Sequence, residues 1–346
     1  MKDKKQKNSS IIWILLSTIL LIIITAITGI SLFRVYMGNF TEVEDVKLYD
    51  KYYVMITEDR KSSFWQSVYA GAYEAGLSEN TYVDMLGDNL TSDYSREDLM
   101  NIAISSEVDG IIVAADESEQ MSALIDEAAI KGIPVVTLVG DNTHSNRCSF
   151  VGVGGYNVGT EYGQQVLQII KESEAKPKTK VSVLVNANAL DSGQNIICSG
   201  IQDTFDRAKE EGKEIEMTLV SIDNTNAFSV EESIRDIFME EDIPDIIICL
   251  NELNTTCVYQ AVVDYNKVGE VSILGYYDSE TIIKAIDRNV IYATISIDTK
   301  QMGEFCVNAL NEYHELGYTS QYFTADIELI KKANVHKYLE GGEDNE

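Results

Sequence analysis

Apolar runs alternate with helical patterns from residue 52 to residue 297. Ten runs have the length and residue types of strands: "YYVMIT", "TYVDML", "GIIVAA", "IPVVTLV", "SFVGVG", "KVSVLV", "EMTLVSI", "DIIICLN", "VSILGYY" and "VIYATISI". Several are continuous rather than alternating, as in strands buried on both faces. Helical stretches lie between them, including residues 95–106, 117–131, 158–174 and 230–240. Repeated strand–helix–strand units predict an α/β fold with parallel sheets.

The number of strands indicates two sheets rather than one. The pattern restarts after the basic, Pro-containing segment "KESEAKPKTK", residues 171–180, which divides two similar halves. We therefore predict two doubly wound, Rossmann-like lobes. In such folds the ligand lies beyond the carboxyl ends of the strands, and here that edge would face the cleft between the lobes.

An apolar segment near the amino end predicts one transmembrane helix. Residues 11–33 carry no charge and follow Lys2, Lys4, Lys5 and Lys7. The run is long enough to span a bilayer. A cleaved signal peptide would have a shorter run with small residues at its end, so we favour an uncleaved anchor, with cleavage as the alternative. The basic residues place residues 1–10 in the cytoplasm, and the stalk (34–50) and all that follows outside it, in a single-pass protein of the cell membrane.

The net charge of the chain excludes one class of partner. The chain has 27 Lys+Arg against 56 Asp+Glu, a net charge of −29, and ends in the acidic tail 341–346. Such a balance repels phosphate backbones, so nucleic acid is not expected as a partner.

The five cysteines lack a CxxC spacing and lie mostly in apolar runs, which is typical of buried thiols, although a disulfide remains open.

The motifs that would indicate catalysis are missing. The three histidines have no carboxylate or cysteine at ligand spacing, and "GVGGYNVG" (152–159) has Asn157 where a dinucleotide loop needs its third glycine. We therefore expect no enzyme, no metal and no cofactor. The predicted strand ends are instead rich in amides, carboxylates and aromatic residues, which suits recognition of a polar small molecule.

The stretch "KSSFWQSVYAGAYEAG", residues 61–76, supplies aromatic residues at one of these strand ends. Ser62 or Ser63 can cap the helix. Phe64 then shares the inward face with Val68, whereas Trp65 is rotated by about 100°. Phe64 is thus explained by core packing alone, and Trp65 is better explained by a cleft.

The order of motifs resembles the type 1 periplasmic binding proteins, specifically the ribose-binding-like sugar receptors of ABC transporters, whose domain is shared by LacI-type repressors. The resemblance covers about residues 51–332 and rests on "SSFWQSVYAGAYEAG", "VDGIIVAADES", "KGIPVVTL", "FVGVGGYNVG", "GQNIICSGIQDTF", "PDIIICLNELNT", "VSILGYYDSE" and "ATISIDTKQMG". It implies a three-segment hinge. Lobe 1 is then residues 51–154 plus 298–325, and lobe 2 is residues 155–297 plus 326–340.

The resemblance also implies a set of ligand-binding residues. Paired aromatics of the family fall on Phe64 and Trp65, a preceding polar contact on Ser62, and a strand-end asparagine on Asn251. Further expected positions are Gln194, Asn195 and Tyr277, with Asp141 and Asp278 one residue beyond where carboxylates are expected. The family's arginine in the helix after "SGQN" is replaced by Ile197.

These observations predict a membrane-anchored solute-binding protein that closes on a small polar ligand, a carbohydrate or a similar molecule. It would serve ABC uptake through a permease or signalling to a sensor histidine kinase. The alternative is a degenerate module that no longer binds a ligand and regulates a partner by protein interaction, with Phe64 and Trp65 as core or interface.

Overall fold

The computed structural model describes residues 2–38, 48–88, 90, 94–173, 178–187, 192–210 and 212–339. The chain divides into two compact units, Met1–Leu48 and Tyr49–Glu346. Most of the predicted stalk (39–47) and the whole acidic tail (341–346) lie outside the described residues.

The first unit contains the helix α1, Lys2–Gly38. It contains the stretch Leu16–Arg34, whose mean hydropathy of 2.4 and length of 19 residues suit a membrane crossing. The predicted apolar helix is therefore present. Its length and composition are shared by membrane anchors and signal sequences.

The second unit contains two six-stranded sheets. The first has the order β11-β5-β4-β3-β1-β2, and all its pairings are parallel. Its strands are β1 (Lys51–Ile56), β2 (Thr81–Met85), β3 (Gly110–Val113), β4 (Val135–Leu138), β5 (Ser149–Val153) and β11 (Tyr322–Ala325).

The other sheet has the order β12-β10-β9-β8-β6-β7 and is parallel except for the pair β10–β12. Its strands are β6 (Thr179–Asn186), β7 (Ile215–Ile222), β8 (Ile246–Cys249), β9 (Ser272–Tyr276), β10 (Ala293–Ile297) and β12 (Ile327–Lys331). The two sheets confirm the predicted α/β class with two parallel-sheet lobes.

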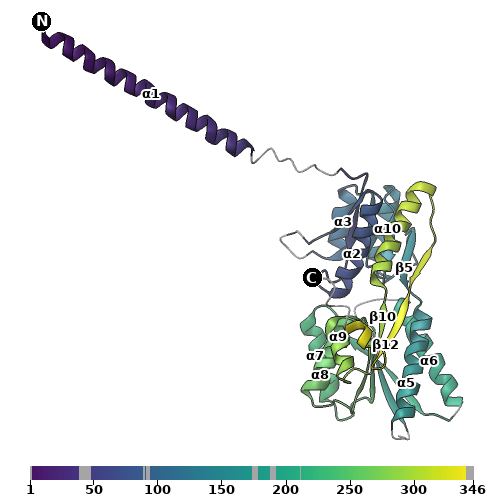
Figure 1. Cartoon of the computed structure of the whole chain (residues 1–346). Coiled ribbons are helices and arrows are strands. Elements are labelled where there is room, and N and C mark those ends of the chain that lie inside the picture. The colour runs from purple at the N-terminus through teal and green to yellow at the C-terminus, as the bar shows by residue number, and fades with distance from the viewer. Residues whose placement is uncertain are drawn as a thin grey trace. The chain divides into compact units, whose positions relative to one another are not determined.

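Helices cover both sheets (Figure 1). We call the first sheet with its helices lobe 1; these are α2 (Ser63–Ser78), α3 (Arg96–Ser105), α4 (Glu119–Ile130) and α10 (Thr299–Leu316). Lobe 2 is the second sheet with α5 (Gly155–Glu172), α6 (Ser192–Glu210), α7 (Ala227–Met239), α8 (Glu252–Asp264), α9 (Glu280–Asp287) and α11 (His336–Leu339).

The chain passes between the lobes three times. The passages follow β5 at Gly154, follow β10 at Asp298 and join β11 to β12 through Asp326. Asp298 N–H donates to the Asp326 carbonyl at 2.9 Å, so two of the three passages are bonded to each other. The lobes are thus joined by a three-segment hinge.

Each sheet is buried on both faces, which explains the continuous apolar runs. In β3, Ile111 and Val113 belong to one hydrophobic cluster and Ile112 to the cluster on the other face. All five cysteines are free, and four of them are buried among these apolar side chains.

Close packing of two helices fixes the position of α2. A Cβ on Gly71 would lie 2.1 Å from the Lys300 carbonyl oxygen, and one on Gly303 would lie 2.0 Å from that of Val68. Only glycine allows the backbones of α2 and α10 to approach so closely. This contact sets where the amino end of α2 lies relative to the hinge passage that leads into α10.

Candidate functional site

The amino end of α2 lies at the carboxyl edge of the first sheet. The loop after β1 leads into Ser62, whose side chain caps the helix by accepting the Trp65 N–H at 3.5 Å. Ser62 rather than Ser63 is therefore the cap residue. The cap places Phe64 and Trp65 in the first turn, where 6% and 5% of their surfaces are exposed.

Aromatic rings from both lobes meet at this turn. The Phe64 ring lies 5.1 Å from Trp65 at 90° and 5.3 Å from Tyr277 at 81°. Tyr276 lies 6.4 Å from Phe64. Tyr276 ends β9 and Tyr277 follows it, so Phe64 joins the edges of the two sheets. We call these four residues the aromatic cluster. Edge-to-face ring pairs of this kind stabilise beyond their buried area by about 0.5–1.5 kcal/mol.

Glu252, the first residue of α8, bonds lobe 2 to the same turn of lobe 1. Its carboxylate accepts from the Ser62 hydroxyl at 2.9 Å, the Ser63 hydroxyl at 2.5 Å and the Phe64 N–H at 3.3 Å. A carboxylate is favoured there because the amino end of α2 carries a partial positive charge. We call the contact of Glu252 with Ser62 and Ser63 the latch. It holds the carboxyl edges of the two sheets face to face.

The strand end after β4 in lobe 1 has an unusual backbone. Val139 has φ of 65°, a left-handed conformation that is costly for a β-branched residue. The Gly140 N–H donates to the Leu138 carbonyl at 2.8 Å across it, which forms a tight three-residue turn. The turn directs the chain into Asp141.

Asp141 is bonded inside lobe 1. Arg147 contacts both its carboxylate oxygens, with Nη2 to Oδ2 at 2.7 Å and a short contact from Nε to Oδ1. The Thr137 hydroxyl and the Asn142 N–H each donate to Oδ1 at 2.7 Å. Both side chains of the ion pair are less than a tenth exposed. This bidentate pair neutralises the carboxylate, and no contact between Asp141 and the aromatic cluster is found in the described part of the chain.

The corresponding strand end of lobe 2 carries Tyr277 and Asp278. Tyr277 also has a positive φ, 75°, and its hydroxyl donates to the Ser63 carbonyl at 3.3 Å. The Asp278 carboxylate accepts from the Ser296 hydroxyl at 2.7 Å. Burial raises the pKa of Asp278, and the nearby carboxylates of Glu252 and Asp298 raise this pKa further. Burial likewise raises the pKa of the Tyr277 hydroxyl.

The other predicted residues lie in lobe 2. Asn251 caps α8, its side chain accepting the Asn254 N–H at 2.7 Å, and the Gln194 side chain accepts the Asn186 N–H at 2.9 Å. Asn195 is exposed. The structure therefore brings Ser62, Phe64, Trp65 and Tyr277 into one set of contacts. The carboxylate of Asp278 is close enough to interact electrostatically with Tyr277 and Glu252. Asn251 and Gln194 instead form hydrogen bonds within lobe 2.

Three further residues at this edge belong to predicted strand ends but were not among the predicted ligand-binding residues. Glu252 and Tyr276 complete the latch and the aromatic cluster. Asn254, in the first turn of α8, is fully buried, and neither atom of its amide has a hydrogen-bond partner among the described residues. The sequence signals for Glu252 are its place at a predicted strand end and in the first turn of a helix, where acidic residues are common because of the helix dipole.

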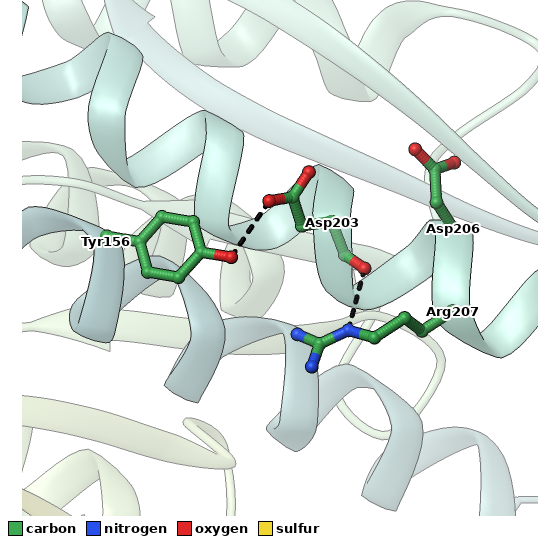
Figure 2. Close-up of a pocket in the computed structure, with 4 residues that line it drawn as sticks. All are labelled: Tyr156, Asp203, Asp206 and Arg207. Atoms are coloured by element: carbon green, nitrogen blue, oxygen red, sulfur yellow. Dashed lines mark hydrogen bonds between the residues drawn. The ribbon is translucent and has the colours of Figure 1, made fainter.

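A hollow of about 390 Å³ lies elsewhere, on the outer surface of α5 and α6 (Figure 2). Tyr156 donates from its hydroxyl to Asp203 at 2.8 Å, and Arg207 donates from Nε to the Asp203 carbonyl at 3.1 Å. Asp206 completes the lining, and all four side chains are exposed. Its open, solvated walls do not resemble a small-molecule site. Among the described residues no group of three His, Cys, Asp or Glu is arranged to hold a metal ion.

Comparison with known proteins gives one family and many related folds. A family model described as a periplasmic binding protein domain matches residues 53–317. No curated protein sequence matches the chain.

Solved structures match almost over their full length. GanP, a glucose-galactose binding protein from Geobacillus stearothermophilus, is 21% identical, with 82% of this chain and 98% of that chain covered and a TM-score of 0.70. XylFII in its complex with LytSN is 23% identical, with the same coverage and a TM-score of 0.67. A solute binding protein of an ABC transporter from Agrobacterium vitis with bound D-fucose is 16% identical over 83% and 97% of the chains, with a TM-score of 0.71. At these identities the likeness establishes the fold.

Proposed function

We propose a function from the premise that this chain belongs to the periplasmic binding protein domain family. It is a solute-binding protein whose lobes close on a small polar ligand, a carbohydrate or a similar molecule, between the carboxyl edges of the two sheets. The predicted site residues Ser62, Phe64, Trp65, Tyr277 and Asp278 serve this role. For Asp141, Gln194, Asn195 and Asn251 we propose a supporting role around the site. Asp141, Gln194 and Asn251 form hydrogen bonds within their own lobes.

The observation that carries the proposal is the buried Asn254 amide. It lies two residues from Glu252, and neither its oxygen nor its nitrogen has a partner in the described part of the chain. Thr57, which follows β1 at the facing edge of lobe 1, has a buried hydroxyl that likewise finds no hydrogen-bond partner among the described residues. Leaving such groups unbonded costs about 1–3 kcal/mol each. A polar ligand or water at this edge would supply the missing bonds.

We further propose that α1 is an uncleaved anchor and that residues 49–346 lie outside the cytoplasm. Lys2, Lys4, Lys5 and Lys7 before the apolar stretch support that orientation. An anchored binding protein needs a membrane partner, either an ABC permease or a sensor histidine kinase. The related structure from Agrobacterium vitis is described as an ABC transporter solute binding protein, and XylFII was solved in a complex with LytSN. The related folds thus include a transporter protein and a protein in complex with a second one, and we take these as support for the two kinds of partner.

Thermal unfolding of the full chain in detergent tests ligand binding. A ligand that binds the folded state at 100 times its Kd stabilises it by about 2.7 kcal/mol, so a screen of pentoses, hexoses and nucleosides should contain at least one compound that raises the Tm. Tyr156→Phe, in the outer hollow, is the matched control and should keep this response. A complete screen without any rise would contradict the proposal.

A second function is favoured by the latch and the aromatic cluster, which join the lobes through the chain's own side chains. In this alternative the protein binds no small ligand and regulates a partner through its surface. The two functions differ in a pull-down of the membrane-anchored chain with its candidate kinase or permease. If the protein regulates its partner without a ligand, it should capture the kinase or permease to the same extent with and without each compound of the screen.

A further inference from the structure

We propose that the interlobe site takes a cationic ligand, a small carbohydrate-like molecule that carries a protonated amine. This inference rests on the proposed solute-binding function and names the chemical class of its ligand. It follows from the aromatic cluster, from two carboxylates at the same edge and from the neutral character of the groups that bond them.

The aromatic cluster has the composition of a cation site. Phe64, Trp65, Tyr276 and Tyr277 are each less than a tenth exposed. The ring planes of Trp65 and Tyr277 stand at 90° and 81° to that of Phe64. In each of these pairs the edge of one ring lies against the face of the other. Aromatic faces attract ammonium groups, most strongly when water is removed.

Two carboxylates of lobe 2 lie beside these rings without a counter-charge. Glu252 is bonded by two hydroxyls and a backbone N–H, and Asp278 by the hydroxyl of Ser296. All of these donors are neutral. In the residues that the structure describes, neither carboxylate forms an ion pair with lysine or arginine. Asp298 adds a third negative charge that acts on Asp278.

The comparison with Asp141 shows that the chain does neutralise a buried carboxylate elsewhere. There Arg147 supplies the positive charge in a bidentate pair. Asp278 is half-buried and is bonded only by a neutral hydroxyl, so it gains more than Asp141 from a cation brought by a ligand. A neutral sugar would offer it only hydroxyl donors, which Ser296 already provides.

Isothermal titration of the full chain in detergent, with matched sugars, tests this inference. The probes are D-glucosamine, D-glucose and N-acetyl-D-glucosamine, and D-galactosamine with D-galactose; each set changes one substituent and only the amines are charged. We expect each amino sugar to bind at least about tenfold tighter than its neutral counterparts, which corresponds to about 1.4 kcal/mol.

Variants test whether the carboxylate of Asp278 causes the preference for amino sugars. Asp278→Asn should reduce the ratio of amino-sugar to neutral-sugar affinity to about one, because the amide removes the charge and keeps the shape. Glu252→Gln should lower the ratio less, since its carboxylate is already bonded by three donors. Glu280→Gln, an exposed acidic residue at the first position of α9, is the matched control and should leave the ratio unchanged.

The outcomes separate this inference from the function on which it rests. Neutral sugars that bind as tightly as the amines would overturn the cationic class and leave solute binding intact. An unchanged ratio in Asp278→Asn would overturn the role of that carboxylate. Absence of binding by every amine overturns the inference, and the response of the neutral sugars then decides whether the proposed function stands.

Discussion

The two lobes share one local structure, at the end of β4 in lobe 1 and at the end of β9 in lobe 2, but its aspartate has different partners in each. After β4 in lobe 1 and after β9 in lobe 2, a residue with positive φ is followed within two positions by an aspartate. Asp141 is locked by Arg147, whereas Asp278 is bonded by the hydroxyl of Ser296. The difference teaches that the strand-end turn delivers a carboxylate, and that the neighbouring side chains decide whether it serves the fold or remains available to a ligand.

The largest effect should come from removing the cation of lobe 1. Arg147→Met leaves the buried Asp141 without its partner, and we expect the free energy of unfolding to fall by about 3–5 kcal/mol. Urea unfolding measures this change. The double variant Asp141→Asn/Arg147→Met is the control, and it should recover a large part of the loss. A single variant within about 0.5 kcal/mol of the wild type would remove the contrast between the two aspartates.

The next effect concerns the latch. Glu252→Gln weakens charge-assisted bonds to Ser62 and Ser63, which are each worth about 1.5–3 kcal/mol in stability, and should shift the lobes toward a more open form. Small-angle X-ray scattering without ligand would record the opening as a larger radius of gyration. Glu280→Gln, at the same position of the neighbouring helix α9, should not change the radius. An unchanged radius in Glu252→Gln would mean that packing alone joins the lobes.

A smaller effect separates capping from latching. Ser62→Ala and Ser95→Ala each remove the N-cap side chain of a lobe 1 helix, and each should lower the stability by about 1 kcal/mol. Only Ser62 also donates to Glu252, so only Ser62→Ala should enlarge the radius of gyration. Equal scattering from the two variants would argue that Ser62 is a cap and nothing more.

The smallest effect is a pH dependence. Since burial raises the pKa of Asp278 above its ordinary 3.8, the folded state holds this proton at pH values where the unfolded chain has released it. The stability contributed by Asp278 is therefore lost as the pH rises through its folded pKa. Unfolding free energies of Asp278→Asn should fall less than those of the wild type between acidic and neutral pH. Parallel curves for the two proteins would contradict the raised pKa.

The sequence was sufficient for most of the fold, because strands buried on both faces leave continuous apolar runs. Each of the ten predicted runs overlaps one strand, β1 to β10. The strands β11 and β12 were not predicted as such. Their side chains are mostly exposed or half-buried, and Asp326 interrupts them, so hydrophobic periodicity gives little signal there.

The site was less predictable because its contacts join residues that are far apart in the chain. Local pattern and resemblance together pointed to Ser62, Phe64 and Trp65, and the cap at Ser62 is confirmed. Nothing in the sequence pairs Ser62 with Glu252, 190 positions away, or sets Arg147 against Asp141. Such pairings depend on how the lobes meet and on a loop conformation, neither of which periodicity encodes. The roles of the predicted ligand residues remain predictions.

Under the proposed solute-binding function, the latch affects how strongly ligand binding changes the fraction of closed molecules. A receptor that is mostly open when empty must spend part of its binding energy on closure, and its apparent affinity falls by the closed fraction. Contacts from Glu252 that favour closure without a ligand remove part of that loss. The same contacts narrow the difference between the empty and occupied populations. The apparent affinity for the ligand thus rises while the change in closed fraction on binding becomes smaller, and the carboxylate of Glu252 controls the balance between these two quantities.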